Sequence, residues 1–132
     1  MTFNINDELP EQIFEIDRAK LRNYADASGD QNPIHQDEDF AKSVGLPNVI
    51  AHGMYTMALA GEAVRRWIGD DKSILEFSAR FTKPVVVPAD AQVQISFIGK
   101  VVDVSQNEVT IDVNALCDGV KVLSQTKARV RL

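Results

Sequence analysis

The stretch "HGMYTMALAGEAVRRWIGDD", residues 52–71, decides the fold because it joins a long apolar run to a helical pattern. Positions 54–68 contain only three charged side chains, which are Glu62, Arg65 and Arg66. A helix that is apolar on nearly all sides is expected inside a protein, and at 1.5 Å per residue this one would be about 20 Å long. Gly69 suits its C-terminal cap. We predict a long buried helix over 54–68.

After this helix the apolar period changes from helical to two. Four stretches alternate apolar with polar residues, and their apolar members are Leu75, Phe77, Ala79 and Phe81; Val93, Ile95 and Phe97; Val109, Ile111, Val113 and Ala115; and Ala128, Val130 and Leu132. This alternation is typical of an antiparallel sheet with one buried and one wet face. Turns are expected at "VSQNE" (104–108) and "CDG" (117–119). Because the helix is the only long cover for the buried face, we predict an α+β fold in which a curved antiparallel β-sheet wraps around one long central α-helix.

The first third of the chain predicts shorter elements. "QIFEI" (12–16) is a candidate strand. Asp17 can cap a helix that ends at Gly29, and Asp37 can cap a second helix within "DEDFAKSVG" (37–45). The side chains expected to face inward are Leu21, Tyr24 and Ala25 from the first helix, and Phe40, Ala41 and Val44 from the second.

Composition limits the classes of protein that remain open. At 132 residues with 45% hydrophobic and 25% charged residues, we expect one globular domain, 1–132. The net charge of −5 argues against nucleic acid as a partner. No apolar run approaches the roughly 18–20 residues that cross a bilayer, so no membrane insertion is expected. The start "MTFNINDELP" lacks a secretory pattern, and Cys117 alone excludes an internal disulfide. A cytoplasmic protein is the expectation.

The octapeptide "SGDQNPIH", residues 28–35, combines turn residues with one of the chain's two histidines. A structural turn accounts for every residue of it except His35. Asp30 and His35 lie five positions apart across a proline, so only a loop that folds back would bring them together. A carboxylate beside an imidazole can exchange protons near neutral pH. Both interpretations, a turn and an acid–base pair held in a turn, remain open at this point.

The second histidine precedes a glycine at the start of the long helix. Amide N–H groups at a helix N-terminus favour negative charge, and Gly53 would let a ligand approach the backbone closely. Such a position can serve as an oxyanion hole for a carbonyl group. It can equally be a tight junction between loop and helix, and these residues alone do not decide between the two.

The stretch "YADASGDQNPIHQDEDFAKSVGLPNVIAHGMYTMALAG", residues 24–61, resembles the signature of the MaoC-like, or type-2, enoyl-CoA hydratases and (3R)-hydroxyacyl dehydratases. The resemblance rests on the D-x-N-P-x-H core and on His52-Gly53-Met54, and it extends into "ARFTKPVVVPAD" (79–90). Within that family the chain resembles the HadB-type catalytic beta subunits of actinobacterial (3R)-hydroxyacyl-ACP dehydratases. The resemblance implies the hot-dog fold, in which a sheet wraps around a long helix.

The family resemblance also implies roles for particular residues. It implies Asp30 and His35 as the catalytic pair and the Gly53 N–H as the oxyanion donor, with Asn32 and Ser28 bracing the loop. His52 is expected to be buried and hydrogen-bonded rather than catalytic. The acyl chain is expected along the helix, past Met54, Met57 and the "PVVVP" segment (84–88). We expect no metal and no organic cofactor, since two isolated histidines and one distant cysteine make a poor metal site.

The implied reaction is reversible hydration of a trans-2-enoyl thioester to a (3R)-3-hydroxyacyl thioester in fatty acid metabolism, with coenzyme A or acyl carrier protein as the carrier. Which of Asp30 and His35 is acid or base stays open. So do acyl length, direction, and a homodimer versus a heterodimer with a second hot-dog subunit. Two alternatives are a hot-dog acyl-CoA thioesterase and a non-catalytic acyl-binding subunit. No role in carrier binding is assigned to the four scattered basic residues Arg80, Lys83, Lys100 and Lys127.

Overall fold

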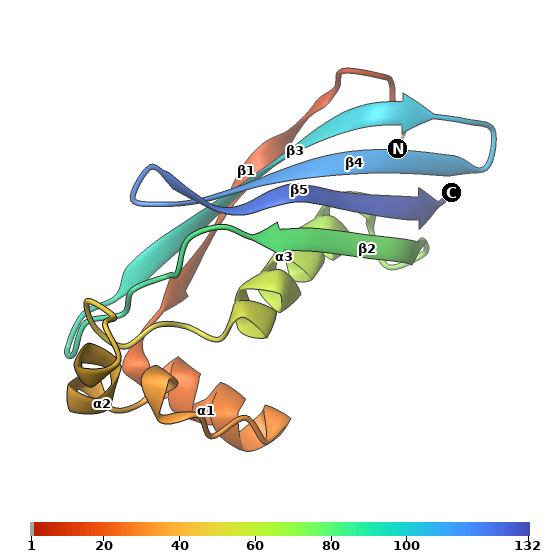
Figure 1. Cartoon of the computed structure of the whole chain (residues 1–132). Helices are drawn as coiled ribbons and strands as arrows, with labels where there is room; N and C mark the ends of the chain where they lie inside the picture. The colour runs from red at the N-terminus through yellow and green to blue at the C-terminus, as the bar shows by residue number, and fades with distance from the viewer. Residues whose placement is uncertain (1) are drawn as a thin grey trace.

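The computed structural model describes residues 2–132 and contains a five-stranded antiparallel sheet that curves over one long helix (Figure 1). The strands are β1 (Glu8–Ile16), β2 (Ser73–Phe81), β3 (Val93–Val104), β4 (Glu108–Cys117) and β5 (Val120–Arg131). Their order across the sheet is β1-β3-β4-β5-β2, so β1 and β2 are the edges. This arrangement confirms the fold class predicted from the switch of period, and it is the hot-dog arrangement.

Three helices and one short 3-10 turn complete the fold. They are α1 (Arg18–Ser28), η1 (Pro33–His35), α2 (Glu38–Ser43) and α3 (Gly53–Ile68). Asp17 and Asp37 cap α1 and α2 as predicted, and Gly29 ends α1 with a φ of 79°. Helix α3 lies across one face of the sheet, whereas α1 and α2 gather beyond one end of it (Figure 1). Among residues 2–132, no helix has the length and apolar character needed to cross a lipid bilayer.

The core lies between α3 and the inward face of the sheet. Its fully buried members include Ile95, Phe97 and Val101 of β3, Val109 and Ile111 of β4, and Ala60, Ala63 and Val64 of α3. Trp67 also packs here, because Gly99 has no side chain: a Cβ built at Gly99 would lie 2.8 Å from the Trp67 ring. The Trp67 indole donates a hydrogen bond to the Pro10 carbonyl (2.8 Å) and so ties α3 to β1.

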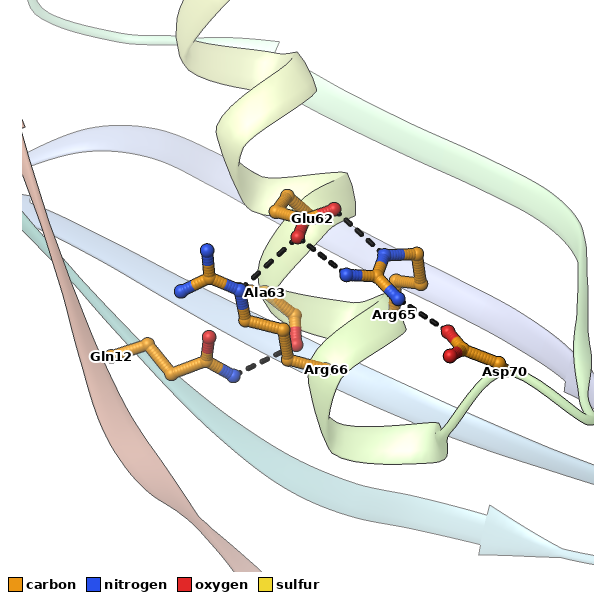
Figure 2. A network of polar contacts seen from close by, with 6 residues as sticks. All are labelled: Gln12, Glu62, Ala63, Arg65, Arg66 and Asp70. Carbon is orange, nitrogen blue, oxygen red and sulfur yellow. Dashed lines mark hydrogen bonds and ion pairs between the residues drawn. The ribbon is translucent and has the colours of Figure 1, made fainter.

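The C-terminal turns of α3 carry a polar network, whose residues Figure 2 shows as sticks. Glu62 accepts hydrogen bonds from Arg65 (2.8 Å) and Arg66 (3.1 Å), and Arg65 also pairs with Asp70. Nearby, the Gln12 amide of β1 donates to a backbone carbonyl of α3 at position 63 (2.9 Å). These contacts fix this end of α3 by side chains and by the strand beside it.

The prediction that α3 would be enclosed on nearly all sides was wrong. Met54, Ala58, Arg65 and Arg66 are exposed, because the sheet covers one side of the helix and leaves the other open. The buried residues of α3 are those on the side that faces the sheet, and they include Ala60, Ala63 and Val64.

Four other side chains predicted to face inward are exposed: Phe40 (39%), Val44 (54%), Phe81 (52%) and Leu132 (44%). Helix α2 has six residues, of which only Ala41 is buried. Phe81 ends an edge strand, and Leu132 lies after the last strand. Each of these four side chains lies at a position where the sheet and α3 do not cover it.

The register of the strands defines two ends of the molecule. At one end, Arg131 of β5 pairs with Ser73 and Glu108. Glu8 of β1 pairs with Lys100, which aligns through Asp112 with Lys127, so β1 begins four residues short of the place where β5 finishes. Phe81, which ends β2, pairs with Leu123 near the start of β5 and lines cavities together with residues of α1, η1 and the first turn of α3.

Candidate active site

The loop of residues 28–35 folds back through its own short polar side chains. The Asp30 N–H donates to Ser28 Oγ (3.2 Å), and the Asn32 N–H donates to Asp30 Oδ1 (3.1 Å). Asn32 Oδ1 then accepts from the Ile34 N–H (3.2 Å) and caps η1, which begins at Pro33. Ser28 and Asn32 therefore form hydrogen bonds within the loop, and the turn carries Asp30 and His35 on one short segment.

Segment 49–51 connects this loop to the rest of the fold. It pairs with segment 85–87 through two backbone hydrogen bonds of 2.8 Å. On its other side, the Ile50 N–H donates to the Ile34 carbonyl (3.1 Å), and the Ile50 carbonyl accepts from Nδ1 of His35 (2.7 Å). The orientation of the His35 ring is thus set by a main-chain carbonyl from a segment 15 residues away.

The two histidines, which we expected to be isolated from each other, lie face to face. Their ring centroids are 3.8 Å apart with an interplanar angle of 24°. Nε2 of His52 bonds to the main-chain carbonyl of Asp30 (3.1 Å), so His52 is buried and hydrogen-bonded as expected. One side-chain ligand atom from each of Asp30, His35 and His52 lies within 4.8 Å of the other two.

We assign no metal to this cluster of Asp30, His35 and His52. Each ring directs one nitrogen to a carbonyl, and near-parallel rings hold their remaining lone pairs side by side. A metal ion needs lone pairs that converge on one point.

The hydrogen bonds fix the tautomers of both rings. A carbonyl oxygen only accepts, so the proton of neutral His35 is on Nδ1, and Nε2 keeps its lone pair. His35 is only 7% exposed, and this burial is the largest influence on its pKa, which it lowers. The hydrogen bond to the Ile50 carbonyl and the charge of Asp30 raise the pKa of His35, whereas His52 lowers it. The net direction is downward, which favours a neutral His35 with an unprotonated Nε2 near pH 7.

The N-terminus of α3 is open. Side chains cap α1, η1 and α2, but among residues 2–132 no side chain caps α3, and the amides of Gly53 and Met54 have no hydrogen-bond acceptor. Unpaired amides at a helix N-terminus attract negative charge. The Phe81 ring lies directly against Gly53, since a Cβ built there would be 3.2 Å from the ring.

Two adjoining cavities meet at Gly53 and Phe81, which line both of them. One cavity has a volume of about 360 Å³ and is lined by His35, by Thr56 and by mostly apolar residues of segments 81–85 and 122–123, which include Pro84, Val85, Val122 and Leu123. The other, of about 480 Å³, is lined by Tyr24, Ser28, Asp30, His52 and Met54. The structure therefore brings Asp30, His35 and Gly53 together around one place.

The residues expected along the acyl chain are divided. Met54 lines the cavity of Asp30, and the "PVVVP" segment contributes Pro84 and Val85 to the cavity of His35, whereas Met57 lines neither. Of the basic residues, Lys83 also lines the His35 cavity, while Lys100 and Lys127 line a separate hollow on the outer face of the sheet.

Sequence reasoning missed three features of this site. Phe81 was assigned to the buried face of a strand, although its position just before a Thr-Lys-Pro loop indicated a strand end. Thr56 was not singled out, although a polar residue one turn after Gly53 on an apolar helix was a usable signal. The Ile50 carbonyl has no sequence signal, because any residue supplies a carbonyl.

In a comparison with protein families, residues 5–118 match the family described as the MaoC-like domain. Among curated proteins, 3-hydroxyacyl-thioester dehydratase X of Mycobacterium tuberculosis is 40% identical over 87 residues, which are 66% of this chain and 30% of that protein. The chain thus spans less than a third of this relative.

Solved structures show the same similarity. A structure described as a MaoC-like dehydratase has a TM-score of 0.95 and 36% identity, and the match covers 98% of this chain and 41% of that one. The R-hydratase PhaJ1 of Pseudomonas aeruginosa has a TM-score of 0.85 and 25% identity over 97% of this chain and 81% of that one.

Proposed function

The chain belongs to the MaoC-like domain family, and from this premise we propose that it catalyses reversible addition of water to a trans-2-enoyl thioester, giving a (3R)-3-hydroxyacyl thioester. The observation that carries the proposal is the meeting of Asp30, His35 and the open N-terminus of α3 at two adjoining cavities. The names of the dehydratase and hydratase relatives support the same reaction class.

In this proposal the thioester carbonyl lies at the first turn of α3. Its oxygen accepts a hydrogen bond from the Gly53 N–H, and the helix dipole adds to the stabilisation of negative charge there. Addition at Cβ moves electron density onto this oxygen and gives an enolate. An unpaired amide aimed at that oxygen stabilises the enolate more than the neutral thioester, which is the condition for rate acceleration.

Asp30 and His35 handle the protons. The oxygen of a bound water forms the new bond to Cβ, and the water loses one proton to the pair; one proton then goes from the pair to Cα, and the enolate collapses to the thioester. The pair ends as it began. A neutral His35 has its unprotonated Nε2 available to accept the proton, and the nearby Asp30 carboxylate favours the imidazolium that results. The reverse order of steps removes water.

The acyl chain is proposed to occupy the cavity of about 360 Å³ next to His35, whose lining is mostly apolar. The cavity of Asp30 opens toward the exposed side of α3 at Met54 and suits the polar thioester side of the substrate. Hydration assays that compare enoyl thioesters of coenzyme A with those of acyl carrier protein, at several acyl lengths, measure both the carrier and the acyl length that the chain prefers.

We also propose that the chain works as a dimer with a second hot-dog subunit, either its own copy or a related chain. Strand β2 is an edge, paired with β5 alone among the described strands, and an exposed edge strand is an open site for pairing. This edge ends at Phe81, so a subunit paired there would lie beside the cavities.

Substitution of the pair tests the reaction. Asp30→Asn and His35→Ala are each expected to reduce crotonyl-CoA hydration at least about 100-fold, because general acid–base groups contribute at least that much. Loss of the enoyl absorbance measures turnover, and circular dichroism checks the fold. Asp39→Asn on α2, an exposed acid away from both cavities, is the matched control and is expected to leave the rate unchanged.

Two results would contradict the proposal. Near-normal hydration in either variant removes that residue from the chemistry. Release of free thiol from saturated acyl-CoA, with no hydration of enoyl-CoA at any chain length, indicates a thioesterase instead.

A further inference from the structure

We propose that His52 is a positioning residue for the reaction, holding Asp30 and His35 in the arrangement that lets them act on one water. This inference deepens the proposed function and rests on it. His52 itself need not touch the substrate, because its contacts with both members of the pair are within the protein.

The first contact fixes Asp30. His52 is 2% exposed, and its Nε2–H donates to the main-chain carbonyl of Asp30 (3.1 Å). The other hydrogen bonds of Asp30 run to Ser28 and Asn32, two residues before and two residues after it, so they shape the loop without placing it on the fold. The bond from His52 joins the loop to the start of α3, 22 residues later.

The second contact fixes His35. The rings of His35 and His52 stack at 3.8 Å, while Nδ1 of His35 donates to the Ile50 carbonyl. The hydrogen bond defines one direction in the plane of the His35 ring, and the stack limits rotation out of that plane. Together they determine where Nε2 of His35 points, which is the atom proposed to exchange the proton.

The His52 ring is itself supported by aromatic side chains. Tyr24 of α1 lies 4.8 Å from it, and Tyr24 also stacks on Tyr55 of α3 at 4.9 Å. A row of four rings thus runs from α3 through α1 to His35. The row supplies a rigid backing for the pair without placing another charged group at the site.

One atom of His52 is not explained by packing alone. Nδ1 is buried and has no hydrogen-bond partner among residues 2–132. A buried polar atom without a partner costs stability, and an apolar ring of similar size would fill the space without that cost. A histidine here is accounted for by its other nitrogen, which supplies the hydrogen bond to the Asp30 carbonyl.

Two variants separate the contacts that His52 makes. His52→Phe keeps a flat ring against His35 and removes the donor, whereas His52→Gln keeps an N–H donor and removes the ring. Val64→Ala, a buried position of α3 remote from the pair, controls for loss of packing. Each His52 variant is expected to lower kcat for crotonyl-CoA hydration about tenfold or more with little change in KM, while Val64→Ala lowers thermal stability without lowering kcat.

A second readout does not depend on activity. The chain has only two histidines, so the nitrogen NMR spectrum of His52→Phe contains one imidazole, that of His35. The groups that face His35 are the Asp30 carboxylate, the Ile50 carbonyl and His52, and removal of His52 is expected to raise the pKa of His35. In the wild type, the His35 signals are expected to report a proton on Nδ1.

The proposed function and the inference about His52 can fail independently of each other. If the wild type hydrates no enoyl thioester, the proposed function fails, and the NMR titration still reports whether His52 controls His35. If both His52 variants keep wild-type kcat, or lose no more than Val64→Ala does, or leave the His35 titration unchanged, His52 is a packing residue and the inference is wrong.

Discussion

Gly53 shows how much one residue position determines at this site. It begins α3, leaves its amide unpaired within the described chain, lines both cavities and has the Phe81 ring against it. Any side chain at this position would meet that ring. In the proposed reaction the residue would combine an electrostatic role, which its N–H supplies, with a steric role, which its missing side chain supplies.

Gly53→Ala is expected to keep the fold and to lower hydration about tenfold. The new methyl group would lie 3.2–3.4 Å from three Phe81 ring atoms, and the half-exposed ring can move away from it. The N–H remains, so the loss should be smaller than the 100- to 1,000-fold typical of a deleted oxyanion donor. Steady-state kinetics and thermal melting measure both effects.

The double variant Gly53→Ala, Phe81→Ala is the control for this explanation. Removal of the ring should restore part of the lost activity, because it restores the space that the methyl group takes. A Gly53→Ala enzyme with unchanged kinetics would show that the approach to this amide does not limit the reaction.

At this same scale, the sequence pointed to Asp30, His35 and Gly53 because their motif resembles that of a known family, and the structure places the three around the same two cavities. It did not identify the stacking of His35 on His52 or the carbonyl of Ile50. Both depend on which segments are brought side by side by segment 49–51, and pairing over 15 or more residues leaves no local pattern.

The two ends of α3 are held in different ways. The C-terminal end of α3 is held by the network of Figure 2, whereas its N-terminal end has no cap within residues 2–132. A helix end without a cap loses stability, commonly about 1 kcal/mol. In α3 the end that is left without a cap is the end that meets the two cavities.

Glu62→Gln is expected to lower the free energy of unfolding by roughly 0.5–1 kcal/mol at pH 7, the upper range for partly exposed ion pairs. Its hydrogen bonds from Arg65, and then from Arg66, lower the pKa of Glu62 from 4.5 to about 2. A lowered carboxyl pKa stabilises the fold above pH 4.5, and this stabilisation is lost as the pH falls toward 2. Urea unfolding of both proteins at several pH values measures the difference.

The pH dependence distinguishes the ion pairs from simple packing. The two unfolding free energies should converge between pH 4.5 and pH 2, where Glu62 becomes protonated. A difference that persists unchanged at pH 2 would mean that Glu62 stabilises α3 through its shape and not its charge.

Element boundaries followed from capping chemistry more reliably than inward faces followed from hydrophobicity. Asp17, Asp37 and Gly69 were placed correctly, since capping is local to three or four residues. Phe40 and Val44 were not, because whether an apolar side chain is buried depends on what the rest of the fold brings against it. Strand β1 is also longer than predicted, starting at Glu8, because its bulge between Leu9 and Gln12 interrupts the alternation.

At the scale of the whole molecule, the proposed dimer predicts a light-scattering mass of twice the chain mass of 14.6 kDa for the chain alone, or the sum of both chain masses with a co-expressed second hot-dog subunit. Ile74→Lys adds a charge at an exposed apolar position of the β2 edge and is expected to shift the protein toward the monomer. Lys100→Glu, on the outer face of the sheet, should leave the mass unchanged.

Hydration activity should fall with the mass of Ile74→Lys if the second subunit completes the walls of the cavities. A wild-type chain that is monomeric at all concentrations and fully active would contradict the dimer and leave the reaction itself unaffected.

The overall architecture was predictable because one change of period, at the end of α3, separates a helix from a set of strands. The order of the strands and the open side of α3 were not, since alternation shows that a strand has a buried face without showing which neighbours it has. Phe81 is an example. Its place in the alternating pattern predicted a buried side chain, but it is exposed because it ends a strand at the edge of the sheet.

The opposed placement of the chain ends and the cavities has an architectural consequence. β5 finishes eight residues after Leu123, the residue that pairs with Phe81, which is on the order of 26 Å at 3.3 Å per residue. The two marked chain ends lie on the same side of Figure 1, away from α1 and α2. A polypeptide appended at either extremity would project away from the two cavities and leave their opening unobstructed. The domain is therefore suited to being joined to further domains in a longer chain, since such a connection leaves both cavities accessible.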